Sequence, residues 1–501
     1  MLFSSYIFIF AFLPVVFCVY FMLNHKGFYR ASIVWLTFAS LFFYSYWNIM
    51  YLPLLLLSIG FNYTISGFML KAQEKARLGN MLFLSNKKLL YIALIFNISL
   101  LCFFKYMDFF IKNVNLVFGS DIGLLHIVLP LGISFFTITQ IAFLVDCYEG
   151  LVKERNPINY ALFVTFFPHL IAGPILHHKE MMPQFADTNN KILNYKNLSL
   201  GLFLFAIGLF KKVVIADSFA KWANTGFSVV ENGEILNFFE SWASILCYAF
   251  QLYFDFSGYS DMAVALGLMF NIKLPINFNS PFKACNISDF WRRWHISLTN
   301  FITTYIYTPM IRAFKNPTFA KMMVATFLTF LIAGIWHGSG WGFVIFGALH
   351  GLALVIHQYW SKKWSKILKF KFPKILGWLL TFLLVLVAWV FFRAENLQGA
   401  VNLLKGMFFG DIVLPSFLES RLGFLSEYGI QFHWWLEQIQ GSFITYLCII
   451  GAFIVCLGFR NSVEQVAHFK PTKWKLFITA LFSLIAFLSI DKAQQFLYFN
   501  F

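Results

Sequence analysis

Long apolar runs separated by short polar loops extend along the whole chain. A helix needs about 20 apolar residues to cross a bilayer, and runs of about that length occur at 3–23, 31–47, 49–70, 89–110, 127–146, 198–216, 236–256, 376–392, 443–459 and 476–490. A further stretch, 322–361, holds forty residues without an Asp, Glu, Lys or Arg. This stretch predicts two spanning helices with a break at Gly338-Ser339-Gly340. The pattern therefore predicts an all-α polytopic membrane protein.

The charges of the loops predict the orientation of these helices. Lysine and arginine dominate the loops at 24–30, 71–88, 360–374 and 460–475, which is typical of cytoplasmic loops. The loop 393–442 has five acidic residues against three basic ones and is predicted to lie outside. Both termini then face outside and the number of crossings is even, so ten or twelve helices fit. Residues 1–501 are predicted to form a single membrane domain.

Composition excludes several other classes of protein. Residues of the set AVILMFWYC make up 59% of the chain and charged residues only 12%, about half the charged share of a soluble domain. The net charge of +16 is explained by cytoplasmic loops, and no nucleic-acid-reading motif accompanies it. The seven cysteines form no CxxC pair, so neither a structural metal site nor a disulfide framework is expected.

Ionisable residues within apolar segments are costly and are therefore the first functional candidates. The segment 167–185, FPHLIAGPILHHKEMMPQF, breaks an apolar run with two prolines and a glycine and brings in His177. Broken helices at membrane depth persist where protein or a water-filled cavity satisfies the backbone. We interpret this segment as lining a cavity, with a simple interfacial turn as the alternative.

Two further clusters carry charge. The segment 251–263 contains Asp255 and Asp261, which suit acid/base chemistry but are better explained as structural partners of other groups. The segment 289–298, DFWRRWHISL, gathers two arginines, two tryptophans and a histidine. Its arginines are suited to gripping phosphate, and an amphipathic helix at the membrane interface is an equal alternative.

The fourth cluster is GIWHGSGW, 334–341, where His337 lies in the longest uncharged stretch of the chain. A neutral imidazole is a competent general base, although a lone helical histidine is more often a packed one. The glycines around it would allow a substrate to approach closely. In the helix that follows, Gly347 and Gly351 form a small-xxx-small pattern that predicts close helix packing.

Taken in order, these segments resemble the membrane-bound O-acyltransferase (MBOAT) family, and most closely the membrane subunit of bacterial alginate and peptidoglycan O-acetyltransferases. The motifs that carry the resemblance are FPHLIAGPI, LFKKVVIADSFA, QLYFDFSGYSDMAVAL, NFNSPF, DFWRRWHISL, GIWHGSGWGFVIFGALHG and the terminal FLYFNF. The resemblance implies a ring of about 10–12 transmembrane helices around a thin core with a central tunnel. It also implies that His337 is the essential histidine and His295 the second.

The chain departs from the family pattern at two places. The family usually has an Arg-Asp-Tyr sequence after DFWRRWHISL, where this chain has Thr303 and Thr304 in place of the charged pair. The family often has an arginine where this chain has His177. Donor or partner contacts at the cytoplasmic mouth are therefore expected to differ. Candidate donor-binding or tunnel-lining residues are Trp336, Arg292, Arg293, Trp294, Asp289, Asp255, Asp261 and His177.

By this resemblance the protein would be a multi-pass protein of the bacterial inner membrane, with acetyl-CoA as acetyl donor and no permanently bound cofactor. Acetyl would pass to a periplasmic SGNH-type acetyltransferase subunit, since the chain has no G-x-S-x-G nucleophile motif of its own. The loop 393–442 would be the docking segment. Only nine of the 38 basic residues are arginine, which suggests an AT-rich genome and favours peptidoglycan over alginate as the glycan.

Several alternatives remain open on the sequence. The glycan could be alginate or another exopolysaccharide, and the acyl group could be D-alanyl or another. The protein could also be a transporter or a scaffold with no chemistry of its own, and such a protein should tolerate His337→Ala far better than an acyltransferase would.

Overall fold

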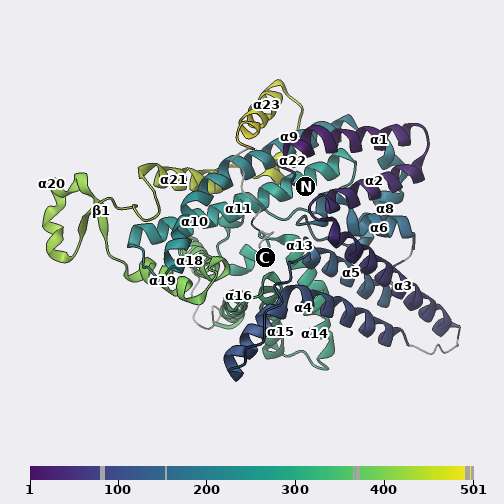
Figure 1. The fold of residues 1–501 in the computed structure, drawn as a ribbon, viewed down its shortest axis with the longest axis horizontal. Coiled ribbons are helices and arrows are strands. Elements are labelled where there is room, and N and C mark those ends of the chain that lie inside the picture. The colour runs from purple at the N-terminus through teal and green to yellow at the C-terminus, as the bar shows by residue number, and fades with distance from the viewer. Residues whose placement is uncertain (79–84, 153–154, 365–366, 368–372, 491–496, 498–501) are drawn as a thin grey trace.

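The computed structural model describes residues 1–78, 85–152, 155–364, 367, 373–490 and 497, and this part of the chain is mostly helical (Figure 1). The terminal FLYFNF motif, apart from Leu497, lies outside the described residues, as do several lysines of the predicted 360–374 loop. The predicted helical membrane fold is confirmed.

Helix α11 (Phe238–Met269) lies at the centre of the molecule. It begins at a capping box in which the Asn237 side chain accepts the backbone N–H of Glu240 at 2.9 Å. Almost all of its residues are buried, as expected for a largely apolar helix with no exposed face. It packs against α9 (Tyr195–Phe210), α10 (Asp217–Glu231), α18 (Lys374–Arg393), α19 (Leu397–Phe409) and α21 (Phe443–Gly458).

The first third of the chain forms a group of helices at the right of Figure 1. These helices are α1 (Leu13–His25), α2 (Tyr29–Ser45), α3 (Leu52–Arg77), α4 (Asn86–Phe118), α5 (Ile133–Tyr148) and α6 (Pro157–Thr165). A buried polar network joins three of them. The Asn62 amide of α3 donates at 3.1 Å to both Asn97 of α4 and Gln140 of α5. Such interhelical hydrogen bonds stabilise packing in an apolar environment.

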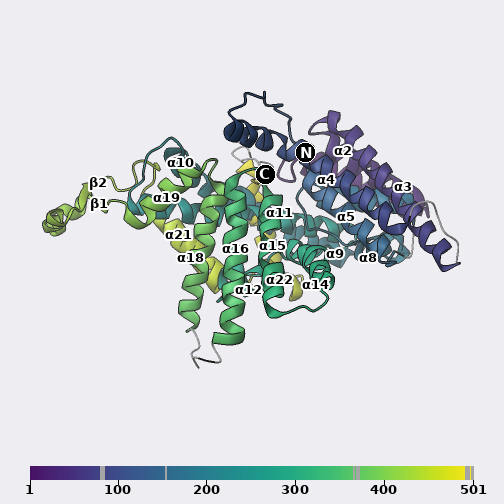
Figure 2. The same cartoon turned by 90° about the horizontal axis from the view of Figure 1, so that it is seen from below.

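The predicted pair of helices within 322–361 is confirmed as α15 (Phe319–His337) and α16 (Trp341–Tyr359), with the break at Gly338–Gly340. The two helices stand beside α18 in Figure 2. Their axes approach closely because glycines meet at the contact: a Cβ added to Gly334 would lie 2.6 Å from the Cα of Gly347. A Cβ on Gly351 would lie 3.0 Å from the carbonyl oxygen of Phe327. The packing role predicted for Gly347 and Gly351 is confirmed.

Seven helices within the described residues are long and apolar enough to span a membrane. They are 8–25, 49–75, 86–118, 195–231, 319–337, 341–364 and 374–393. Four other predicted spans form shorter helices: α2, α5, α21 and α23 (Lys473–Phe487) have 15 to 17 residues. The run 127–146 is helical only from Ile133, since Pro130 and the left-handed Gly132 (φ +71°) precede it.

The predicted outer loop 393–442 contains the helix α19 and then a small lobe, seen projecting at the left of Figure 1. In this lobe β1 (Val413–Pro415) pairs in parallel with β2 (Gln431–His433). This short sheet is an addition to the predicted helical architecture.

Candidate active site

His337 is the last residue of α15 and is only 4% exposed. Its ring lies among aromatic side chains, with ring-centroid distances of 5.3 Å to Phe392 and 5.9 Å to Phe346. The next residue, Gly338, has extended backbone, and a Cβ there would collide with the ring of Phe343. Glycine at this position therefore serves the tight turn into α16.

His295 approaches His337 from a different part of the chain. It is fully buried and precedes α13 (Ile296–Ile302) in the left-handed conformation, with φ +44° and ψ 54°. Asn277 holds the following residues, because its carbonyl accepts the N–H of Ile296 at 3.0 Å and its side chain accepts that of Ser297 at 3.1 Å. The ring centroids of His295 and His337 are 6.4 Å apart. The two predicted histidines thus meet in the core.

The C-terminal end of α15 is held by two consecutive residues of α4. The ammonium of Lys105 donates to the carbonyl oxygens of Trp336 at 2.7 Å and His337 at 2.8 Å, and the Tyr106 hydroxyl donates to that of Ile335 at 2.7 Å. The last carbonyls of a helix have no partner within the helix, and a cation there also interacts favourably with the helix dipole. Lys105 is not among the residues predicted for the site, although a lone lysine inside a predicted span is itself a signal.

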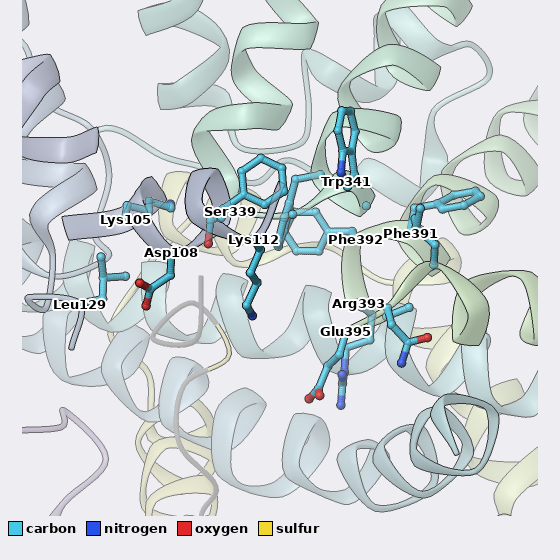
Figure 3. Close-up of a pocket in the computed structure, with 18 of the residues that line it drawn as sticks. Lys105, Asp108, Lys112, Leu129, Ser339, Trp341, Phe391, Phe392, Arg393 and Glu395 are labelled. Carbon is cyan, nitrogen blue, oxygen red and sulfur yellow. The ribbon is translucent and has the colours of Figure 1, made fainter. Parts of the chain in front are cut away.

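A cavity of about 950 Å³ lies beside this arrangement (Figure 3). It is bounded by the C-terminal part of α4, the 338–342 turn and the end of α18. Figure 3 shows Lys105, Asp108 and Lys112 of α4 with Ser339 on one side, and Arg393 and Glu395 on another. The cavity therefore lies at the end of α18 that leads into the 393–442 segment.

Gln251 of α11 lines the same cavity and is only 4% exposed. Its side-chain oxygen is buried and has no hydrogen-bond partner among the described residues. The Nε of Arg393, another lining residue, is also buried and also has no hydrogen-bond partner among the described residues. Buried polar groups are normally hydrogen-bonded, so these two groups suit contact with a polar ligand.

The other residues of the DFWRRWHISL motif lie in two different places. Trp294 is buried in an aromatic cluster, with its ring 4.9 Å from that of Trp389 and 5.7 Å from that of Phe290. Asp289 instead pairs with Arg293 at 3.0 Å and with Arg292 at 3.7 Å, and the Arg292 side chain is largely exposed. Asp289, the two arginines and Trp336 are not among the residues that line the cavity. Trp336 lies directly beside His337, with ring centroids 5.0 Å apart.

Asp255 and Asp261 pair with consecutive lysines of a π-helical turn (Lys211–Ala216) between α9 and α10. Lys212 lies 2.9 Å from Asp255 and 2.7 Å from Asp217, and Lys211 lies 2.7 Å from Asp261. The motifs LFKKVVIADSFA and QLYFDFSGYSDMAVAL are therefore complementary in charge. This geometry agrees with the structural interpretation of the two aspartates.

His177 belongs to a separate polar cluster. Its Nδ1 lies 3.0 Å from the hydroxyl of Tyr305, which donates to Asp146 at 3.0 Å. Asp146 in turn pairs with Nδ1 of His178 at 2.7 Å. The interrupted segment before His177 is buried against protein, and none of its residues lines the 950 Å³ cavity.

A family model described as MBOAT, the membrane-bound O-acyltransferase family, matches residues 10–397. The chain therefore belongs to this family and is a multi-pass membrane O-acyltransferase.

Its relatives act on several polymers. A peptidoglycan O-acetyltransferase of Helicobacter pylori is 45% identical over an alignment that covers 100% of this chain and 98% of the relative. A probable alginate O-acetylase of Pseudomonas aeruginosa is 36% identical, with 81% and 75% covered. A teichoic acid D-alanyltransferase of Bacillus subtilis is 28% identical, with 53% and 69% covered.

Proposed function

We propose that this protein takes acetyl from acetyl-CoA on the cytoplasmic side of the bacterial inner membrane and passes it outward for O-acetylation of peptidoglycan. The observation that carries the proposal is the buried pair His337 and His295, placed beside a large cavity with charged and aromatic lining residues. The identity of 45% to a peptidoglycan O-acetyltransferase, over the full length of the chain, favours this glycan over alginate.

In the proposed reaction His337 is the general base. It accepts the proton of an acceptor hydroxyl while the hydroxyl oxygen attacks the carbonyl carbon of the acetyl thioester. The carbon–sulfur bond then breaks, and the thiolate of CoA leaves and takes up the proton. His295, held in its left-handed conformation, would orient the reacting groups from the opposite side. The acceptor would enter through the 950 Å³ cavity, where Gln251 and Arg393 each supply a hydrogen-bonding group that has no partner among the described residues.

A periplasmic SGNH-type acetyltransferase subunit is the proposed partner, and the segment 393–442 its docking site. The lobe in this segment exposes large aromatic side chains, such as Phe417 (73% exposed) and Tyr428 (79%). A second cavity, of about 410 Å³, lies at the base of the lobe and is lined by Asp411, Glu437 and Trp434, among others. An acidic hollow with aromatic neighbours suits a partner surface that offers basic and apolar side chains.

The donor step can be tested on the purified protein in lipid vesicles. With radiolabelled acetyl-CoA, the wild type should release CoA and label an acceptor, and His337→Ala should lower this rate at least about 10²-fold. The control is His357→Ala, on the same pair of helices but away from the cavity lining, which should keep the wild-type rate. An active His337→Ala variant would contradict the catalytic role of His337 and favour the transporter or scaffold interpretation.

The docking step can be tested in cells that express the proposed SGNH-type subunit with an affinity tag. Asp411→Lys with Glu437→Lys should reduce co-purification of the two subunits, since both substitutions reverse the charge of the acidic hollow. The control is Glu74→Lys, at an exposed position near the end of α3 in a segment predicted to face the cytoplasm, which should leave co-purification intact. If the partner co-purified equally with all variants, the acidic hollow would be excluded as the docking site.

A further inference from the structure

We propose that Lys105 is a positioning residue that fixes His337 for acyl transfer. The inference rests on the proposed role of His337 as general base. It arises from a separate observation, the bonds between the Lys105 ammonium and the end of α15.

All three N–H donors of Lys105 have protein acceptors. Besides the carbonyl oxygens of Trp336 and His337, the ammonium donates to the hydroxyl of Ser134 at 3.3 Å. The residue is 9% exposed, and within the described part of the chain no carboxylate lies within salt-bridge distance. A buried cation without a counter-ion is expensive. Carbonyl oxygens at a helix C-terminus replace the counter-ion here.

These bonds act on the backbone of His337 itself. The chain leaves the helix immediately afterwards, because Gly338 is extended. Lys105 and Tyr106 together satisfy the carbonyls of three consecutive residues, 335 to 337. Without Lys105 the last two of these carbonyls would be left without a cap inside an apolar protein, and the final turn of α15 would be free to shift. The ring of His337 would then move relative to His295.

Such a shift would strongly affect catalysis, because a base displaced by about 1 Å can cost about 10²-fold in rate. Lys105 also lines the cavity, so direct binding of an acceptor is the competing role. The geometry favours positioning, because its three donors are already occupied by Ser134, Trp336 and His337.

The test compares Lys105→Met, Lys105→Arg and Tyr106→Phe in the vesicle assay with acetyl-CoA. Lys105→Met should lower kcat about 10²-fold and leave the KM for acetyl-CoA within about twofold. Lys105→Arg keeps a charged donor of different shape and should retain about a tenth of the wild-type kcat. Tyr106→Phe removes a bond two residues away from His337 and should cost less than about tenfold.

A double variant separates positioning from other roles. If Lys105 acts through His337, then Lys105→Met should cause no further loss in a His337→Ala background. A further loss as large as in the wild-type background would overturn the proposal, as would an unchanged kcat in Lys105→Met. Should Lys105→Met fail to accumulate in membranes, the same cycle with Lys105→Arg decides, and an unchanged kcat there is equally contrary.

The proposed function fails in a distinguishable way. A wild-type rate in His337→Ala would exclude His337 as the general base, whatever the rates of the Lys105 variants. Loss of activity in His337→Ala together with wild-type kinetics in Lys105→Met would keep the proposed function and remove only the positioning role.

Discussion

Buried polar side chains in this protein fall into two kinds, those with partners in the fold and those without. Gln140 is of the first kind: its side chain bonds to Asn62 at 3.1 Å, to Ser58 at 2.9 Å and to Tyr160 at 3.2 Å. Gln251 is of the second kind, since its oxygen has no partner in the described part of the chain although it faces the cavity. The fold needs the first glutamine, and we expect the acceptor to need the second.

Substitution of both glutamines by methionine tests this distinction. Gln251→Met should leave the thermal unfolding temperature in detergent unchanged or slightly raised, because its side-chain oxygen has no hydrogen bond to the described residues, while transfer to the acceptor falls at least about tenfold. Gln140→Met should lower the unfolding temperature, since Asn62, Ser58 and Tyr160 would each lose a buried hydrogen bond. A Gln251→Met enzyme with full transfer activity would show that this wall of the cavity does not touch the acceptor.

At the scale of elements, the α15–α16 pair is the feature that places His337. Its close contact depends on glycine, since a Cβ on Gly347 would lie 2.7 Å from the carbonyl oxygen of Phe330. Gly451 of α21 is also a helical glycine, but a Cβ there would meet nothing within 4 Å.

Leucine at these two positions should give opposite results. Gly347→Leu should force the helices apart and lower both the unfolding temperature and the transfer rate, whereas Gly451→Leu should be tolerated because leucine favours helix by about 1 kcal/mol over glycine. Thermal unfolding and the vesicle assay measure the two effects. Similar stability of the two variants would contradict the close packing of α15 against α16.

The break between α15 and α16 was predictable because Gly338 and Gly340 interrupt an uncharged run with residues that disfavour helix. The late start of α5 was not predictable from hydropathy, because the run 127–146 is apolar throughout. Pro130 and Gly132 nevertheless keep the chain from becoming helical before Ile133. The two histidines could be singled out by their motifs. Their approach to 6.4 Å could not, since it depends on the fold of the chain between them.

The partners of the buried charged residues could not be predicted from the sequence either. Asp255 and Asp261 were assigned a structural role, but their partners Lys212 and Lys211 lie in a different motif, and only the packing of α9 on α11 brings them together. Lys105 was overlooked because a single lysine hardly changes the hydropathy of its span. Its importance comes from the carbonyls of α15, which belong to a distant part of the chain.

At the scale of the whole molecule, the loop charges predict that 360–374 faces the cytoplasm and 393–442 the outside. Single cysteines in a cysteine-free background test this topology. A cysteine in place of Ser416 should react with a membrane-impermeant maleimide in intact spheroplasts, and one in place of Lys362 only after permeabilisation. The reverse labelling pattern would contradict the predicted orientation and would place the 950 Å³ cavity on the cytoplasmic side.

We propose that this membrane O-acyltransferase uses His337 to pass acetyl outward for O-acetylation of peptidoglycan. Mass spectrometry of muropeptides tests it most directly, in cells that carry the wild type, a gene deletion or His337→Ala at equal membrane levels. We predict that acetylated muramic acid is lost in both the deletion and the His337→Ala strain. Unchanged acetylation in the deletion strain would exclude peptidoglycan as the acceptor, and acetylation lost in the deletion but kept in His337→Ala would contradict the catalytic role of His337.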